Sequence, residues 1–112
     1  MPELKAKHAM RALSIRQPFA NKILNRSKKV EMRKIRTNKT ERVYIYASQR
    51  YDDPKARSMT HGMIVGTVEI VGCVKKGSWY HWLLSAPRRL ARPIRPKGRP
   101  QPVWFIPFPT GR

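Results

Sequence analysis

Residues 28–49 read KKVEMRKIRTNKTERVYIYASQ and contain two segments in which apolar and polar side chains alternate. In the first segment, residues 29–35, Glu31 and Arg33 share one face, because side chains two positions apart in a strand point the same way. The second segment, residues 42–47, alternates in the same manner. This period of two predicts two β-strands, the first of which projects a carboxylate and a guanidinium from one face.

The sequence upstream of this stretch predicts a short strand followed by a helix. Residues 10–15 are mostly apolar, and Pro18 stands where a helix can begin, since its missing N–H would have no partner in the first turn anyway. Apolar residues then recur at helical spacing over residues 19–24. We therefore expect one helix here, ending by Ser27.

Downstream, residues 48–61 predict a loop with one helical turn, and residues 63–74 predict the longest strand. Gly66 and Gly72 inside that strand suggest bulges or the close approach of another segment. We expect a short helix over residues 79–85 that stops before the next proline.

Prolines recur from Pro87 to Pro102, which excludes a regular helix there and favours an extended, polyproline-like segment. The apolar residues 103–106 that follow predict the last strand, which would close the sheet.

Five short motifs occur in order along the chain. They are Leu13-Ser14-Ile15 with Pro18, then Lys28 with Glu31 and Arg33, then Ala47-Ser48, then residues 64–73, and finally Pro102-Val103-Trp104-Phe105. Together they resemble the ASCH domain of the PUA-like superfamily of small RNA-associated β-barrels, although Arg26 stands where that family has a glycine. The resemblance implies an α+β fold, a PUA-like small mixed β-barrel of about five to six strands with two or three short helices. From length and composition we expect a single domain over residues 10–108, with a basic, flexible arm at 1–9 and a tail at 109–112.

Charge is the strongest signal in the composition. Twenty-five Lys and Arg oppose six Asp and Glu, which gives a formal net charge of +19. A soluble domain needs a net charge of only about 2 to 8, so this excess is typical of a protein that binds a polyanion. We therefore expect RNA or another single-stranded nucleic acid as the partner, with an acidic protein as the alternative. The densest basic run is expected to track the phosphate backbone, and its members include Arg88, Arg89, Arg92 and Arg95.

Several other classes of protein are disfavoured. No apolar run approaches the roughly 20 residues of a membrane-spanning helix. The residues after Met1 lack the apolar core of a secretory signal, so a cytoplasmic monomer with no membrane association is expected. Cys73 is the only cysteine, which excludes an internal disulfide and a cysteine-based zinc site. The histidines lack metal-binding spacing, so we expect no metal and no cofactor.

The resemblance locates a ligand cleft, and each candidate residue in it also has a structural interpretation. Glu31 and Arg33 either pair with each other or bind a base edge and a phosphate. Ser48 ends a strand at the expected rim, where it either bonds a ligand or closes a turn. Trp79 offers a ring for base stacking, whereas Trp82 is expected in the core. The predicted nucleic-acid contacts are Arg16, Gln17, Lys28, Glu31, Arg33, Ser48, Gln49, Trp79, Arg88, Arg89, Arg92 and Arg95.

An RNA-binding module is the leading hypothesis, and a hydrolase of the same fold is the alternative. Glu69 lies in an apolar strand, so we expect it to be buried and paired with Arg33 or Lys28 across the barrel. Some ASCH relatives hydrolyse RNA or a modified nucleoside, and in that alternative Lys28, Ser48 and Glu69 would be catalytic without a metal. Chemistry like that of an N4-acetylcytidine amidohydrolase is weakened, because Glu31 stands where that branch has a threonine.

Overall fold

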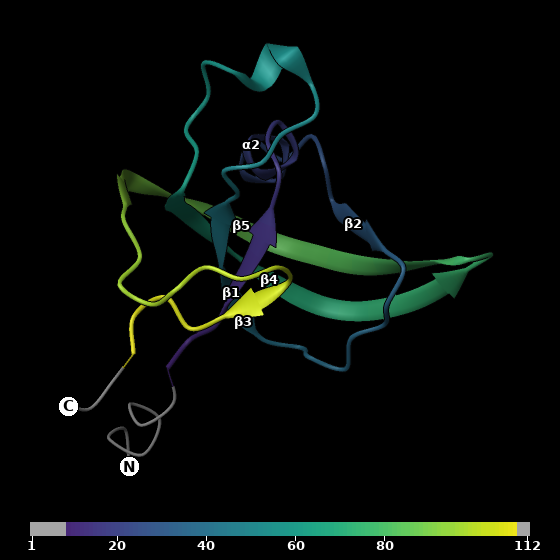
Figure 1. Ribbon diagram of the computed structural model, residues 1–112. Coiled ribbons are helices and arrows are strands. Elements are labelled where there is room, and N and C mark those ends of the chain that lie inside the picture. Colours follow the sequence, from purple (N-terminus) through teal and green to yellow (C-terminus); the bar gives the residue numbers. More distant parts are fainter. Residues whose placement is uncertain (1–8, 110–112) are drawn as a thin grey trace.

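Six strands form one strongly curled sheet in the computed structural model, which describes residues 9–109 (Figure 1). The strands are β1 (Ala12–Ile15), β2 (Val30–Arg33), β3 (Arg42–Ala47), β4 (Met63–Lys76), β5 (Trp79–Ile94) and β6 (Trp104–Phe105). Their hydrogen-bonded order is β2-β5-β4-β3-β1-β6, so β2 and β6 are the two edges. The expected barrel is thus realised as a barrel-like sheet that does not close by backbone pairing.

The sheet is mixed because β1 pairs in parallel with β3, whereas all other neighbours are antiparallel. A parallel pair needs a crossover connection, and here the chain passes through α2 (Phe19–Leu24) and β2 between the two strands. The only other helical element of the described residues is a single 3-10 turn, η1 (Pro54–Ala56), which confirms the expected loop with one turn. The described part of the chain therefore has one α-helix, fewer than expected.

The prediction of a helix over residues 79–85 is wrong, because this segment begins the long strand β5. The two-residue turn Gly77–Ser78 reverses the chain, and Gly77 has the positive φ (63°) that such hairpin turns favour. Trp79 pairs directly with Lys76 across the turn. The aromatic residues that follow are compatible with a strand, because aromatic side chains favour this conformation. Only the first part of β5, Tyr80 to Leu83, pairs with β2. Pro87 lies beyond it, where β5 has β4 as its only neighbour, so the missing N–H of the proline removes no hydrogen bond to a second strand.

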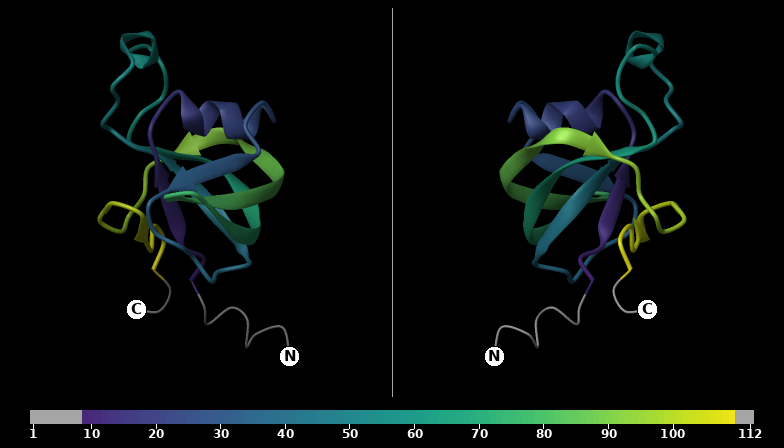
Figure 2. Two further views of the ribbon diagram at one scale, coloured as in Figure 1. Left: turned by 90° about the vertical axis from the view of Figure 1, so that its right-hand side faces the viewer. Right: turned by 90° about the vertical axis from the view of Figure 1, so that its left-hand side faces the viewer.

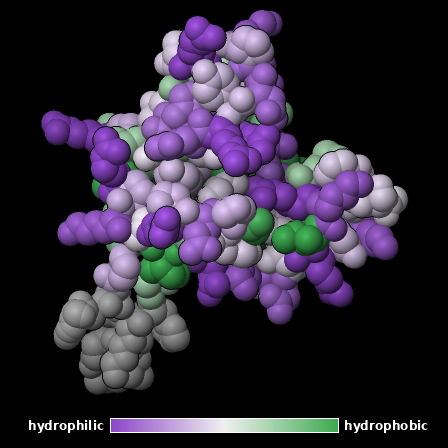
Figure 3. Space-filling model, viewed as in Figure 1, coloured by the Kyte–Doolittle hydropathy of each residue, from purple (hydrophilic) through white to green (hydrophobic). Residues whose placement is uncertain are grey.

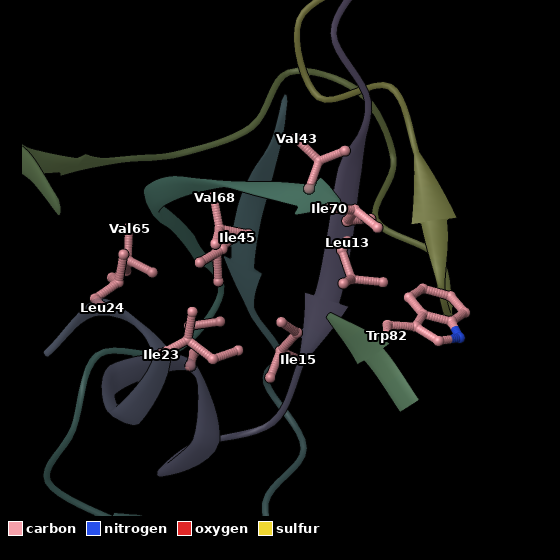
Figure 4. Close-up of a cluster of buried hydrophobic side chains, with 12 residues drawn as sticks. Leu13, Ile15, Ile23, Leu24, Val43, Ile45, Val65, Val68, Ile70 and Trp82 are labelled. Carbon is pink, nitrogen blue, oxygen red and sulfur yellow. The ribbon is translucent and has the colours of Figure 1, made fainter. Parts of the chain in front are cut away.

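The hydrophobic core fills the inside of the curl (Figure 4). Its largest fully buried side chains are Trp82, Leu13, Ile15, Ile23, Ile45, Ile64, Ile70, Val43 and Val68. Each aliphatic side chain of this kind contributes roughly 1.5 to 3 kcal/mol by leaving water. Burial of Trp82 confirms its expected place. Helix α2 lies across one end of the curled sheet (Figure 2), and Gly66 permits this, because a Cβ there would come within 2.5 Å of the Leu24 side chain.

Side chains, instead of backbone bonds, join the end of the sheet formed by β2 and β5 to the end formed by β1 and β6. Trp82 of β5 stacks on Trp104 of β6, with ring centroids 5.7 Å apart and an interplanar angle of 12°. Trp82 Nε1 also donates to the Ile35 carbonyl at 3.0 Å, which fixes the ring. On the same side, Arg33 Nη2 of β2 donates to the carbonyl oxygen of Ser14 in β1 at 2.7 Å. We call this join the seam.

Residues 1–8 and 110–112 lie outside the described range, and with them most of the expected arm and tail.

Candidate functional site

A cleft of about 800 Å³ opens beside the seam, between β2 and the ends of β1 and β3. Its fourth side is the loop of residues 99–103 that leads into β6. The sequence-predicted residues that line it are Arg16, Glu31, Arg33, Ser48 and Gln49. The fold therefore brings together residues from three segments that are far apart in the chain.

Glu31 and Arg33 form the charged floor of the cleft. Arg33 Nε donates to Glu31 Oε2 at 2.8 Å, so their expected shared face is confirmed. Lys28 Nζ lies 3.7 Å from the other Glu31 oxygen. Glu31 is only 9% exposed, and a carboxylate this buried needs such cationic partners. Because Arg33 also bonds Ser14 and lies over the Trp82 ring at 5.6 Å, it is held rigidly, and only its remaining N–H groups are available to a ligand.

The rim of the cleft is basic, and its charge is largely not neutralised by the protein. Arg50 and Arg99 line it, and neither has an acidic partner within residues 9–109. Arg16 pairs with Asp52 at 2.6 Å, but both side chains are exposed, so water screens the pair. Ser48 Oγ accepts from the Arg50 N–H at 3.2 Å and so holds the turn that carries this arginine. An anionic group at the rim would meet two guanidinium groups that have no competing partner.

Apolar and aromatic side chains form the walls between floor and rim. Phe19, at the start of α2, remains 46% exposed although it is a large aromatic side chain. The ammonium groups of Lys22 and Lys28 lie 5.8 and 5.3 Å from its ring centroid. Ile15 and Val103 add aliphatic surface. Flat, apolar walls of this kind suit a planar ligand, as aromatic surfaces in many nucleotide sites do.

Tyr46 also lines the cleft, and its ring packs edge-on against Phe105 at 5.1 Å. Burial raises the pKa of the Tyr46 phenol above its ordinary value of 10.0, and the nearby Arg95 guanidinium partly opposes this. At neutral pH the phenol is therefore protonated and can donate a hydrogen bond. It is a poor general base.

The loop of residues 99–103 is held in place by contacts at both ends. Ser14 N–H donates to the Val103 carbonyl at 2.9 Å, and Ser14 Oγ donates to the Gln101 carbonyl at 2.6 Å. Before the loop, the Gly98 N–H donates to the Pro107 carbonyl at 2.8 Å. Val103 has φ 65°, which is strained for a β-branched residue, so these bonds hold the backbone against an unfavourable conformation.

Sequence analysis missed several cleft residues. They are Phe19, Tyr46, Arg50, Arg99, Gln101 and Val103. Ser14 belonged to a recognised motif, but its role in holding the loop did not follow from it. Val103 also belonged to a recognised motif, but tertiary contacts, which local patterns do not record, bring it and the other missed residues to the cleft.

Two predicted contacts have structural roles beside the cleft. Gln17 is 4% exposed, and its side chain donates to the Thr60 carbonyl at 3.0 Å and accepts from the Asn21 N–H at 2.9 Å. Both ends of the amide are therefore occupied by protein. Lys28 does not line the cleft and lies behind Glu31, whose charge it helps to balance.

The expectation for Glu69 is wrong. Glu69 is exposed on β4, between buried Val68 and Ile70, so strict alternation puts it on the outer face of the sheet. Arg33 and Lys28 pair with Glu31 instead. The structure thus does not assemble Lys28, Ser48 and Glu69 into one site.

The remaining predicted contacts lie on β5 or directly after it. Arg88, Arg89 and Arg92 are exposed along its second half, which is strand and not polyproline helix up to Ile94, and Arg95 is exposed directly after it. Arg89 Nη2 donates to Asn21 Oδ1 at 2.9 Å beside a smaller groove of about 400 Å³. Trp79 is at the opposite end of the strand. Hydrophilic side chains cover most of the face shown in Figure 3.

Within residues 9–109, no group of three or more His, Cys, Asp or Glu side chains is arranged to hold a metal ion. No helix in the same range is both long enough and apolar enough to cross a membrane.

Comparison with known proteins agrees with this architecture. The family model of the ASCH domain matches residues 13–103. Among solved structures, the crystal structure of ASCH from Zymomonas mobilis is similar, with a TM-score of 0.58 over 78% of this chain and 73% of that chain. Sequence identity is 16%, so this likeness concerns the fold alone. A search of curated proteins found no match.

Proposed function

This chain belongs to the ASCH domain family, and on that premise we propose that it is a small RNA-binding module that holds one nucleotide in the cleft. The observation that carries the proposal is the arrangement of the cleft, in which a basic rim without internal partners surrounds aromatic and apolar walls. A nucleotide has the same two parts, a flat base and an anionic phosphate.

The base would lie between the walls, against the exposed ring of Phe19 and the side chain of Tyr46. Its polar edge would face the floor, where Arg33 retains donor groups and Glu31 retains lone pairs. The neutral Tyr46 phenol supplies a further donor. These groups can form the hydrogen bonds that orient a base.

The phosphate would lie at the rim, near Arg50 and Arg99. Arginine suits this task because its planar guanidinium can bond two phosphate oxygens at once. Both arginines would then gain the anionic partner that the protein itself does not provide.

Further phosphates would follow the exposed arginines of β5. Arg88, Arg89 and Arg92 lie on this strand and Arg95 directly follows it, and the net charge of +19 favours a long polyanion over a single nucleotide. Contacts of this kind give affinity without sequence preference.

Salt dependence of binding tests the proposal. Affinity for a single-stranded RNA of about 12 nucleotides, measured by fluorescence anisotropy, should fall with log salt at a slope of roughly −3 to −4 if 4 to 6 phosphates are neutralised. The double variant Arg50→Gln/Arg99→Gln should lose part of that slope. Arg36→Gln, which removes an exposed charge that does not line the cleft, is the control. A slope near zero would contradict nucleic-acid binding.

The hydrolase alternative is tested in the same preparation. Exposed Glu69 is far less suited to general acid or base work than a carboxylate inside the cleft would be. Incubation with total RNA and with acetylated cytidine should therefore give binding to RNA without turnover. Turnover that is lost in Lys28→Arg while RNA binding persists would favour the enzyme, because arginine cannot exchange a proton near neutral pH. Equal binding to an acidic polypeptide would favour the protein-partner alternative.

A further inference from the structure

A second concentration of aromatic and cationic groups lies at the tip of the β4–β5 hairpin, which projects from the curled sheet (Figure 1). Trp79 directly follows the Gly77–Ser78 turn and is 39% exposed. Lys34 Nζ lies 4.1 Å from the Trp79 ring centroid and 3.4 Å from Ser78 Oγ. The indole thus has no protein core around it, and one ammonium is positioned beside it.

The charge around this tip is uniformly positive. Lys75 and Lys76 precede the turn, and Lys75 Nζ lies 5.8 Å from the Tyr80 ring centroid. None of these lysines forms an ion pair among residues 9–109. Glu31, the carboxylate nearest to Lys34 in sequence, is occupied on the cleft side by Arg33 and Lys28, and Glu69 of β4 pairs with Ser85, away from the turn. An approaching polyanion would therefore meet no acidic group of the described structure at the tip.

The tip is also adjacent to the cleft. Arg33 of the cleft floor pairs in register with Tyr80, the neighbour of Trp79. Lys34, whose ammonium lies beside the indole, is the residue directly after Arg33. Because consecutive residues of a strand point to opposite faces, a nucleic-acid strand that leaves the cleft would pass over the edge strand β2 to reach Lys34 and Trp79.

We propose that Trp79 and Lys34 form a second nucleotide site, at which a base of the same single strand stacks on the indole while Lys34 binds the flanking phosphate. The inference rests on the proposed function, because it concerns the nucleotides next to the one in the cleft. An exposed cation–π contact is weaker than base stacking, so the base displaces the Lys34 ammonium from the ring. The ammonium of Lys34 then binds the phosphate in place of the ring, so neither Lys34 nor Trp79 loses a contact without gaining another.

This geometry explains why the ligand would be single-stranded. Stacking on an isolated indole needs a base whose face is free, and duplex bases are already stacked on each other. Such stacking also accepts any base, so the hairpin tip would add affinity without adding sequence preference.

The test compares two ligands of equal charge, a single-stranded RNA of about 12 nucleotides and an abasic phosphodiester chain of the same length. Trp79→Ala should weaken binding of the RNA about five-fold or more and leave binding of the abasic chain unchanged. Trp79→Phe should restore most of the loss, because it restores an aromatic face. Val71→Ala, at an apolar residue of the same hairpin that is 52% exposed, is the matched control and should bind as the parent does.

Fluorescence gives an independent readout. Of the three tryptophans, Trp82 is fully buried and Trp104 is partly buried against it, so quenching by RNA that is present in the parent and absent from Trp79→Phe reports on Trp79. Thermal melting of each variant checks that the fold is intact, which is expected because Trp79 is partly exposed.

The outcomes separate this inference from the proposed function. If Trp79→Ala binds RNA as the parent does while Arg50→Gln weakens binding, the hairpin site is wrong and the cleft proposal stands. If Trp79→Ala weakens both ligands equally, the contribution is not stacking and the inference is overturned. If Trp79→Ala weakens RNA binding and Arg50→Gln does not, the hairpin binds bases but the cleft proposal fails. An equal effect of Trp79→Ala on an acidic polypeptide would overturn the inference in favour of a protein partner.

Discussion

Arg33 on the floor of the cleft and Arg50 at its rim are the same residue type in opposite electrostatic surroundings. Arg33 bonds the Glu31 carboxylate and the Ser14 carbonyl, and it lies over the Trp82 ring. Arg50 lines the same cleft with no acidic partner in the described range. The floor arginine is thus part of the fold, and the rim arginine is available to a ligand.

The difference follows from where each backbone segment lies. Arg33 sits on β2, an edge strand that needs something other than backbone bonds to hold it against β1. Arg50 follows the end of β3, in a turn where the Ser48 hydroxyl accepts a hydrogen bond from the backbone N–H of Arg50 and not from its side chain. A motif residue that sequence analysis assigns to binding can therefore belong first to the architecture.

The largest expected effect tests the floor. Glu31→Gln should lower the free energy of unfolding by about 2 to 3 kcal/mol, because it leaves Arg33 and Lys28 without a countercharge in a partly buried site. Urea denaturation measures this. Glu41→Gln is the matched control, since Glu41 pairs with Arg11 at the same 2.8 Å but is 40% exposed, and it should cost under about 1 kcal/mol. Equal losses in the two variants would contradict the contrast between buried and exposed pairs.

A double-mutant cycle between Glu31 and Arg33 should give the next largest effect. Glu31→Gln and Arg33→Met share the same hydrogen bond, so their effects should be less than additive by about 1 to 2 kcal/mol. The corresponding cycle for Arg11 and Glu41 should give a coupling of only about 0.2 to 1 kcal/mol. Full additivity at the floor would mean that the pair does not hold the seam.

Local patterns were enough to predict this floor. The alternation of residues 29–35 is a property of one strand, and it correctly gave Glu31 and Arg33 a common face. The same rule also applies to Glu69, but its apolar neighbours suggested burial on both faces of β4. In the structure its two neighbours Val68 and Ile70 are buried, whereas Glu69 itself lies on the outer face of the sheet and is exposed.

Features that depend on pairing between distant segments could not be predicted. The aromatic run from Trp79 fits a helix or a strand, and its pairing with both β2 and β4 decides the outcome. Arg99 reaches the cleft only because Ser14, far earlier in the chain, holds the loop through Gln101. No local spacing records such a contact.

Substitution of the two rim arginines should have almost no effect on stability. Arg50→Gln/Arg99→Gln should change the free energy of unfolding by no more than about 0.5 kcal/mol, since these side chains have no acidic partner to lose. The same variant should flatten the salt slope of RNA binding by about 1.4, at roughly 0.7 per phosphate contact. A loss of stability comparable to that of Glu31→Gln would show that the rim arginines are structural as well.

Tyr46 lines the same cleft as the floor and rim arginines, and the ionisation of its phenol should have the smallest effect on the free energy of unfolding. Burial raises the pKa of its phenol above 10.0, so in an ultraviolet titration one of the four tyrosines should ionise later than the ordinary value. Below pH 10 both the folded and the unfolded states keep this proton. As pH rises above 10, the unfolded state releases it first, so the free energy of unfolding should decrease.

Substitution of Tyr46 and of its charged neighbour makes that assignment specific. Tyr46→Phe should remove the late component, whereas Tyr51→Phe should leave it in place. Because the positive charge of Arg95 lowers the pKa of Tyr46, Arg95→Gln should move the late component to still higher pH. No shift would mean that Arg95 does not act on the phenol, and that the arginines of β5 and Arg95 are electrostatically separate from the cleft. The expected shift would instead connect the two, and a phosphate bound at Arg95 should then raise the pKa of Tyr46 as Arg95→Gln does.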